Sequence, residues 1–193
     1  MFRMRRAAVA AACAVLAALG YSEAAGAATS ASPTVTGTVS GGALSVATSA
    51  APTFSANLAT GDQTPTYTLP LTATDTTGTG AGWNLTITST QFTTGGATPH
   101  TLATNASTVT STPPLTVACV AGTTCTNPTD AVTYPLGVPA GATAPTAVKM
   151  FNAAANTGLG AFTVTPTVGV FVPASTFAGS YSSTLTVSIV SGP

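Results

Sequence analysis

Regular alternation of aliphatic and hydroxyl side chains most restricts how this chain can fold. Along residues 83–90, Trp83, Leu85 and Ile87 fall on one side of an extended chain, and an asparagine and threonines fall on the other. Residues 181–190 repeat the pattern. Because successive side chains of a strand point to opposite faces, a period of two predicts strands with one buried face and one wet face. Lysine, leucine and glutamate, which favour helices, are rare, so the sequence predicts an all-β fold.

Shorter segments of similar character are separated by glycine-rich and proline-rich turns. We expect a hairpin turn at Gly41–Gly42 between two strands of residues 33–48, and one or two helical turns within residues 149–156. Further strands are expected in residues 53–58, 66–74, 83–90, 115–119, 131–136, 161–172 (interrupted at Pro166) and 181–190. Several short strands with turn signals between them predict an antiparallel β-sandwich, either immunoglobulin-like or jelly-roll-like.

The first 27 residues have the composition of a secretory signal peptide. Three arginines precede an apolar run at residues 7–19, and Ala25-Gly26-Ala27 follows as a small-residue cleavage site. The alternative is a membrane anchor, but the apolar run is short against the roughly 20 residues that a spanning helix needs. We therefore predict a helical signal peptide at 1–27, an N-terminal strap or first strand at 28–40, a β-sandwich domain at 41–193, and export.

Charge is scarce throughout the chain, which has four basic and four acidic residues among 193. Beyond the leader only five side chains could carry charge: Lys149, Asp62, Asp75, Asp130 and His100. Acid–base catalysis and metal binding need several ionisable groups brought together, so we expect no enzyme, no metal and no cofactor. A neutral surface also does not attract nucleic acid or anionic lipid. The aspartates stand beside turn-forming residues, so we expect them to cap turns.

Two cysteines remain after the leader, and they lie close together in the sequence. Cys119 and Cys125 flank five residues that include a glycine, so the chain between them can fold back on itself. Outside the cytosol such a pair is oxidised. We predict a disulfide that holds a local loop. The alternative, a redox-active pair, lacks any nearby group that would lower a thiol pKa.

Two motifs in the chain resemble the paired signatures of a known family. The first runs from Asp75 through a glycine-rich turn into Gly82-Trp83-Asn84-Leu85. The second has Val172-Pro173, then Gly179-Ser180-Tyr181, then a terminal Thr-Leu-Thr strand. In this order the motifs resemble the WxL domain family over about residues 67–193. Val187 stands where the family's second tryptophan falls.

The resemblance implies a role at the bacterial surface. Members are secreted proteins of Gram-positive bacteria that associate non-covalently with the cell wall through peptidoglycan. The sequence contains no LPxTG-type sorting motif, so we expect the protein to be held at the cell wall by non-covalent contacts. The implied partner is a cell-wall polysaccharide or peptidoglycan, with other surface proteins as further candidates.

Four residues are candidates for binding that partner: Trp83, Asn84, Leu85 and Tyr181. An exposed indole offers a flat apolar face for the C–H groups of a sugar, and the Asn84 amide suits sugar hydroxyls. The alternative is that Trp83, which alternates with Leu85, points into the core, as tryptophans on sandwich strands commonly do. Tyr181 has the same two alternatives, and the sequence leaves both open.

A second function is compatible with the same composition. Uncharged, threonine-rich edge strands permit sheet addition between chains, which would make the protein a self-assembling subunit of a surface fibre or coat. In that case residues 28–39 could act as a donated strand. A wall-binding protein should sediment with peptidoglycan as a monomer, whereas a subunit should polymerise alone.

Overall fold

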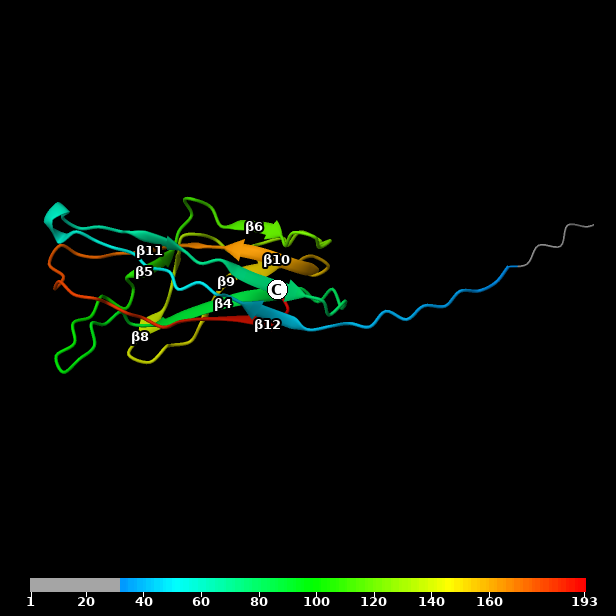
Figure 1. The fold of residues 1–193 in the computed structure, drawn as a ribbon, viewed down its shortest axis with the longest axis horizontal. Helices are drawn as coiled ribbons and strands as arrows, with labels where there is room; N and C mark the ends of the chain where they lie inside the picture. Colours follow the sequence, from blue (N-terminus) through cyan, green and yellow to red (C-terminus); the bar gives the residue numbers. More distant parts are fainter. Residues whose placement is uncertain (1–31) are drawn as a thin grey trace, which may run out of the picture. The chain divides into compact units, whose positions relative to one another are not determined.

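The computed structural model describes residues 32–193 (Figure 1). The predicted signal peptide at 1–27 and the start of the predicted strap at 28–40 lie outside the described residues. The chain divides into two compact units, Met1–Thr38 and Val39–Pro193. In the first unit, residues 32–38 are exposed and form no strand.

The second unit confirms the predicted all-β fold. Its regular elements are twelve strands and one short 3-10 helix: β1 (Leu44–Ala47), η1 (Leu58–Thr60), β2 (Thr66–Thr68), β3 (Leu71–Asp75), β4 (Trp83–Thr90), β5 (Ser107–Val109), β6 (Thr116–Cys119), β7 (Leu136–Gly137), β8 (Ala140–Gly141), β9 (Val148–Ala153), β10 (Gly160–Thr165), β11 (Thr167–Val170) and β12 (Leu185–Ser191). Within residues 32–193 no helix has the length and apolar character to cross a membrane.

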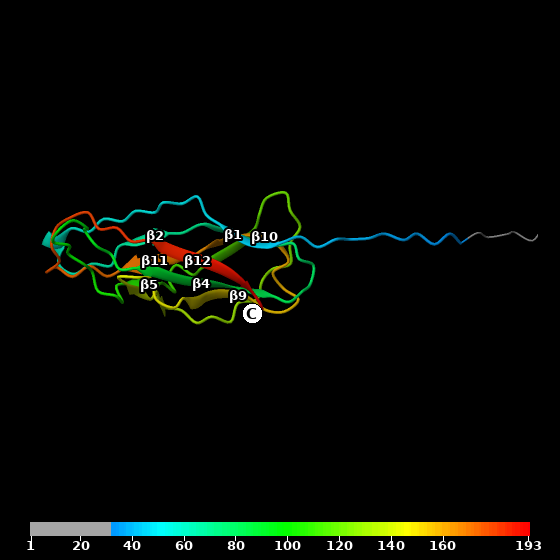
Figure 2. The same ribbon diagram turned by 90° about the horizontal axis from the view of Figure 1, so that it is seen from below.

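The strands form three small sheets that are almost wholly antiparallel. Their orders are β1-β3-β10-β6, β2-β11-β5-β7 and β12-β4-β8, with β9 also paired to β4. Only the short β4–β8 pairing is parallel among these. Figures 1 and 2 show the long strands running along a common direction. The arrangement is that of a β-sandwich, as predicted.

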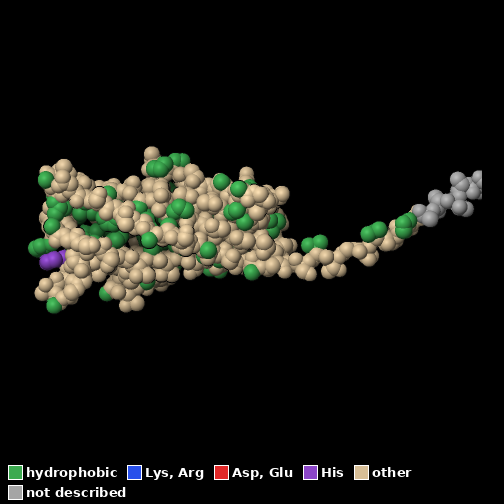
Figure 3. All heavy atoms as spheres, viewed as in Figure 1, with side chains coloured by type: hydrophobic (Ala, Val, Ile, Leu, Met, Phe, Trp, Pro, Cys, Tyr) green, Lys and Arg blue, Asp and Glu red, His purple; other side chains and the backbone are tan. Residues whose placement is uncertain are grey.

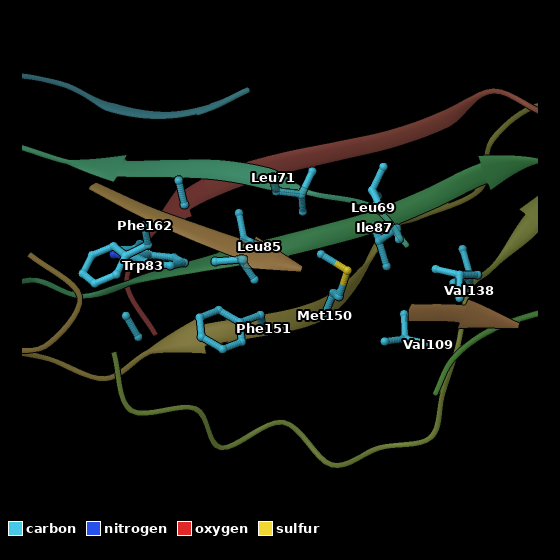
Figure 4. Packing of buried hydrophobic residues seen from close by; sticks show 14 residues of the cluster. Leu69, Leu71, Trp83, Leu85, Ile87, Val109, Val138, Met150, Phe151 and Phe162 are labelled. Atoms are coloured by element: carbon cyan, nitrogen blue, oxygen red, sulfur yellow. The ribbon is translucent and has the colours of Figure 1, made fainter. Parts of the chain in front are cut away.

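The core forms where the inner faces of these sheets meet (Figure 4). Alternate residues of β4 are buried there, with Trp83, Leu85 and Ile87 all fully inaccessible to solvent. Leu71 of β3 and Phe162 of β10 belong to the same cluster. The strand predicted over residues 83–90 therefore has the predicted bounds and the predicted buried face.

Residues 149–156 are not helical, contrary to the sequence prediction. Residues 148–153 form β9, which pairs antiparallel with β4 across a bulge at Leu85/Thr86. Its residues from Met150 to Ala153 are buried in an unbroken run. Met150 and Phe151 are adjacent and both buried, so the segment lacks the period of two, and its pattern does not distinguish a strand covered on both faces from a short buried helix.

The predicted hairpin at Gly41–Gly42 is also wrong, because only β1 forms on one side of it. The Gly42 N–H donates to the Thr76 carbonyl oxygen over 2.7 Å, so the chain continues along β3 before β1 begins. Cβ atoms added at Gly41 and Gly42 would collide with Thr77 and Thr76. The glycines therefore permit close passage along a neighbouring chain and make no turn.

Two other strand predictions are also wrong. Residues 53–58 form no strand, and of residues 131–136 only the last belongs to one. In the second segment, side chains bind the backbone in place of a neighbouring strand. The Ala131 N–H donates to Asn152 Oδ1 over 2.9 Å, and the Val132 N–H donates to Asp130 Oδ1 over 3.1 Å.

Candidate functional site

The tryptophan that marks the first motif belongs to the core. Its side chain has 0% exposure, and its Nε1–H donates to the Gly158 carbonyl oxygen over 2.8 Å. The rings of Phe151 and Phe162 lie 5.7 and 6.3 Å from it, centroid to centroid. A buried indole needs a partner for its N–H, and Gly158 supplies one. Trp83 is therefore a core residue and does not offer its indole to a ligand at the surface.

The other predicted binding residues do not join Trp83 in a common surface. Leu85 is fully buried, and the half-buried Asn84 donates from Nδ2 to the Gly192 carbonyl oxygen over 2.8 Å. Tyr181 lies beyond the opposite end of the β4–β12 ladder, because Trp83 pairs with Ser191. The prediction that these four residues share one binding surface is therefore wrong. Trp83, Asn84 and Leu85 of β4 are engaged within the fold. Tyr181 lies in a separate groove.

That groove, called here the β12 groove, is a hollow of about 1210 Å³ beside strand β12. One wall comes from residues 46–58 and the other from residues 176–187. Tyr67, Leu69, Leu71 and Phe92 are among the residues that reach its interior. Every lining residue is uncharged, and Figure 3 shows apolar side chains inside a hollow on this face. The groove therefore suits a neutral ligand with apolar surface.

Aromatic rings pack together toward one end of the β12 groove. Phe54 meets Phe92 edge to face at 5.4 Å and stacks with Tyr67 at 6.4 Å between centroids. Burial raises the pKa of Tyr67 to about 12, because the phenolate would be poorly solvated there. The Tyr181 hydroxyl donates to the Phe177 carbonyl oxygen over 2.9 Å. This bond closes the 177–181 loop on itself, and the Tyr181 side chain packs against the buried cluster that contains Val170 and Val172.

A second aromatic pair faces solvent at the same end. The rings of His100 and Phe177 stack with centroids 3.9 Å apart and 13° between their planes. Phe177 is 63% exposed, and the chain's one histidine is visible at the end of the face in Figure 3. The His100 N–H donates to Thr94 Oγ1, and the Thr94 N–H donates to the His100 carbonyl oxygen, both over 3.0 Å. Phe177 therefore presents an exposed, flat ring that stacks on the partly buried His100.

The sequence does not predict this pair. It marks His100 only as an ionisable group to be weighed for catalysis, and Phe177 stands in a loop with no periodic pattern. Seventy-seven positions separate the two residues, by the difference of their numbers. No local signal could have indicated that their rings stack, because the contact depends on how two distant loops fold.

The three aspartates of the described chain hold loops by accepting backbone hydrogen bonds. Asp75 Oδ1 accepts from the Thr77 N–H over 3.0 Å, as Asp130 does from a residue two positions on, so the predicted turn capping is confirmed for these two. Asp62 instead accepts from the distant Ala174 N–H over 2.7 Å and anchors the loop that carries Phe177. These carboxylates are therefore occupied in holding the fold.

Asp130 also organises a small polar cluster away from the groove. The Tyr134 hydroxyl lies 2.9 Å from Asp130 Oδ2, and 2.6 Å from the Met150 carbonyl oxygen. The pKa of Tyr134 is raised, first by burial, then by the negative charge of Asp130 and by the hydrogen bond to it. The cluster joins the loop at Asp130 to strand β9. Within residues 32–193, no group of three or more His, Cys, Asp or Glu residues is placed to hold a metal ion.

The predicted disulfide between Cys119 and Cys125 is present, with 6.0 Å between the two Cα atoms. It links the end of β6 to the loop that passes Gly160, where an added Cβ would collide with Cys125. Neither cysteine lines the β12 groove. The bridge therefore holds a local loop, as expected.

A β-sandwich with few charged side chains, a neutral groove and an exposed aromatic ring has the features of a binding domain. A family model described as "WxL domain surface cell wall-binding" matches residues 31–193. Because this match covers most of the chain, the chain belongs to the WxL family. It is a cell-surface protein that associates with the cell wall. No curated protein and no solved structure matches the chain.

Proposed function

We propose that this protein is exported, binds peptidoglycan non-covalently through its β-sandwich domain, and performs no reaction. Family membership supports the cell-wall partner in general terms. The leader at residues 1–27 supports export. The aspartates, which accept hydrogen bonds from backbone N–H groups, support a structural use of the few acidic side chains.

The observation that carries the proposal is the stacked pair of His100 and Phe177. Sugars bind aromatic rings through their C–H faces, and a ring suits this purpose when it is flat, exposed and held still. Phe177 meets the first two conditions, and stacking on His100 supports the third. The groove beside it presents hydroxyls from Thr176, Ser180 and Tyr181, which can bond sugar hydroxyls. We place the glycan contact at this end of the domain.

The proposed contact has a distinct dependence on salt. None of the residues lining the groove is charged, so ionic attraction contributes little to binding. Retention on peptidoglycan should therefore change little between low and high salt. A binding mode that depended on ion pairs would weaken steeply over the same range.

Sedimentation with purified peptidoglycan tests the proposal directly. Phe177→Ala should weaken retention about tenfold, since loss of one well-packed aromatic contact costs about 1.4 kcal/mol. Phe171→Ala is a matched control, because Phe171 is 43% exposed and does not line the groove. His100→Phe, which keeps a ring beneath Phe177, should retain more binding than His100→Ala.

Three results would contradict the proposal. Retention of Phe177→Ala equal to that of the unaltered protein would remove the aromatic pair from the site. Equal losses of retention for Phe177→Ala and Phe171→Ala would indicate non-specific binding by exposed aromatic residues. Absence of retention for the unaltered protein would refute peptidoglycan as the partner.

A further inference from the structure

Tyr67 carries a hydroxyl that binds no other group of the described chain. The hydroxyls of the other two tyrosines within residues 32–193, Tyr134 and Tyr181, each bind a backbone carbonyl oxygen. The Tyr67 hydroxyl has no such partner there, although the ring is half-buried. In this part of the chain no side-chain oxygen that is shielded from solvent lacks a partner, so the Tyr67 hydroxyl is open to solvent. Because Tyr67 lines the β12 groove, the hydroxyl is available to a ligand in that groove.

The surroundings of this hydroxyl are mostly apolar. The Tyr67 ring stacks with Phe54, which meets Phe92 edge to face. All three rings pack against a cluster of buried residues that includes Leu102 and Val172, and both of these also line the groove. A phenol hydroxyl is protonated at neutral pH and can donate a hydrogen bond. This end of the groove therefore offers a hydrogen-bond donor beside aromatic and aliphatic surface.

The rim of the groove is polar but uncharged. Thr53 and Ser55 lie on one wall and Ser180 on the other, and all three are exposed. Their hydroxyls can both donate and accept hydrogen bonds. A hydrocarbon chain in the groove would cover the Tyr67 hydroxyl without offering it an acceptor, and an unsatisfied polar group disfavours binding. The groove therefore favours a ligand that carries hydroxyls and an acceptor over a purely apolar one.

The absence of charge in the groove restricts the ligand further. None of the lining residues is Asp, Glu, Lys, Arg or His. The stem peptides of peptidoglycan carry carboxylates, and an amino sugar without its acetyl group carries an ammonium. Either charge would lose water in the groove without gaining a partner of opposite sign. The N-acetyl groups of the glycan strand are neutral, and each joins an apolar methyl to a carbonyl acceptor.

We propose that the β12 groove recognises the N-acetyl groups of amino sugars. The acetyl carbonyl oxygen accepts a hydrogen bond from the Tyr67 hydroxyl, the methyl packs against Phe54 and Phe92, and sugar hydroxyls bind the rim. This inference rests on the proposed binding of peptidoglycan and names the part of that polymer that the groove selects. The hollow of about 1210 Å³ exceeds the roughly 300–1,000 Å³ of common small-ligand pockets, so it is large enough for more than one sugar unit.

Calorimetric titration of the purified protein with a soluble tetramer of N-acetylglucosamine tests the inference. We expect saturable binding of this tetramer by the unaltered protein. The glucosamine tetramer, which carries ammonium groups, should bind at least tenfold more weakly. The N-formyl tetramer keeps the carbonyl group and lacks the methyl, so its binding should be weaker by about fourfold for each methyl that the groove buries.

Tyr67→Phe tests the hydrogen bond separately from the packing. It removes the hydroxyl and breaks no hydrogen bond within residues 32–193, so melting at neutral pH should be unchanged. Binding of the N-acetyl and N-formyl tetramers should weaken by the same factor, about fivefold, because both present the carbonyl acceptor. Tyr134→Phe is the matched control: it also removes a phenol hydroxyl, but Tyr134 does not line the groove, so its affinity below melting should be unchanged.

Sedimentation with peptidoglycan distinguishes failure of this inference from failure of the proposed function. Retention on intact peptidoglycan without binding of the N-acetylglucosamine tetramer would overturn the inference and leave the proposed function in place. Equal retention on intact and chemically de-N-acetylated peptidoglycan would do the same. Binding of the tetramer without retention on peptidoglycan would support N-acetyl recognition and refute the proposed function. An unchanged affinity of Tyr67→Phe for the tetramer would overturn the inference.

Discussion

Replacement of Trp83 by alanine tests whether the residue that marks the family motif acts in the fold or at the ligand. The indole is fully buried, contacts Phe151 and Phe162, and donates a hydrogen bond to Gly158. Truncation of a buried tryptophan leaves a cavity and removes apolar contacts, at a cost of about 3–5 kcal/mol. For a domain of this size, each kcal/mol lowers Tm by about 2–4 °C, so we expect a decrease of about 6–20 °C.

Trp83→Phe separates the hydrogen bond from the packing. Phenylalanine keeps an aromatic ring but leaves the Gly158 carbonyl oxygen without its buried donor, which costs about 1–3 kcal/mol. It should therefore destabilise the protein less than alanine does. Trp83 is the chain's single tryptophan, so unfolding of these variants must be followed by circular dichroism in place of indole fluorescence.

Wall binding provides the discriminating measurement. Below its melting temperature, the folded fraction of Trp83→Ala should sediment with peptidoglycan as the unaltered protein does, because the indole offers no surface to a ligand. Loss of retention with an unchanged melting curve would refute the assignment of Trp83 to the core. It would instead support an exposed indole that contacts the sugar.

Three further changes should act on stability through separate contacts. Gly158→Ala should cost about 2–4 kcal/mol in a denaturant titration, because φ is +71° there and a Cβ would lie 2.7 Å from Trp83 Nε1; unchanged stability would contradict that packing. Reduction of the Cys119–Cys125 disulfide should lower the free energy of unfolding by about 2 kcal/mol, given the short loop, and leave peptidoglycan retention intact. Because burial raises the pKa of Tyr67 to about 12, the free energy of unfolding should be constant below pH 10 and fall by about 3 kcal/mol as pH rises past 12; Tyr67→Phe should remove that decrease from an alkaline stability profile.

Local pattern was enough to predict the strands with a clear period. The bounds of β4, Trp83–Thr90, match the predicted range, and the break at Pro166 separates β10 from β11 as expected. Prediction failed where neighbours supplied the deciding contacts. Strand β9 is buried on both faces from Met150 to Ala153, so its sequence lacks alternation. The Ala131 and Val132 N–H groups donate to side chains and not to a neighbouring strand.

The candidate site was predictable only in part. Tyr181 does line the β12 groove, but Trp83 and Leu85 do not, since both are buried in the core. The burial of Trp83 agrees with its alternation with Leu85 and Ile87, although the sequence alone also allowed an exposed indole. The His100–Phe177 pair had no sequence signal, because its two loops are joined only through tertiary contacts.

The amino-acid sequence by itself determined that this is a nearly uncharged all-β chain with a local disulfide and the two WxL motifs. These properties depend on composition and on spacings of a few residues, which act before any distant contact forms. Only the tertiary structure decided that the motif tryptophan is buried and that two distant rings stack at the surface. Such features depend on which strands pair and which loops meet, and no local spacing determines those contacts.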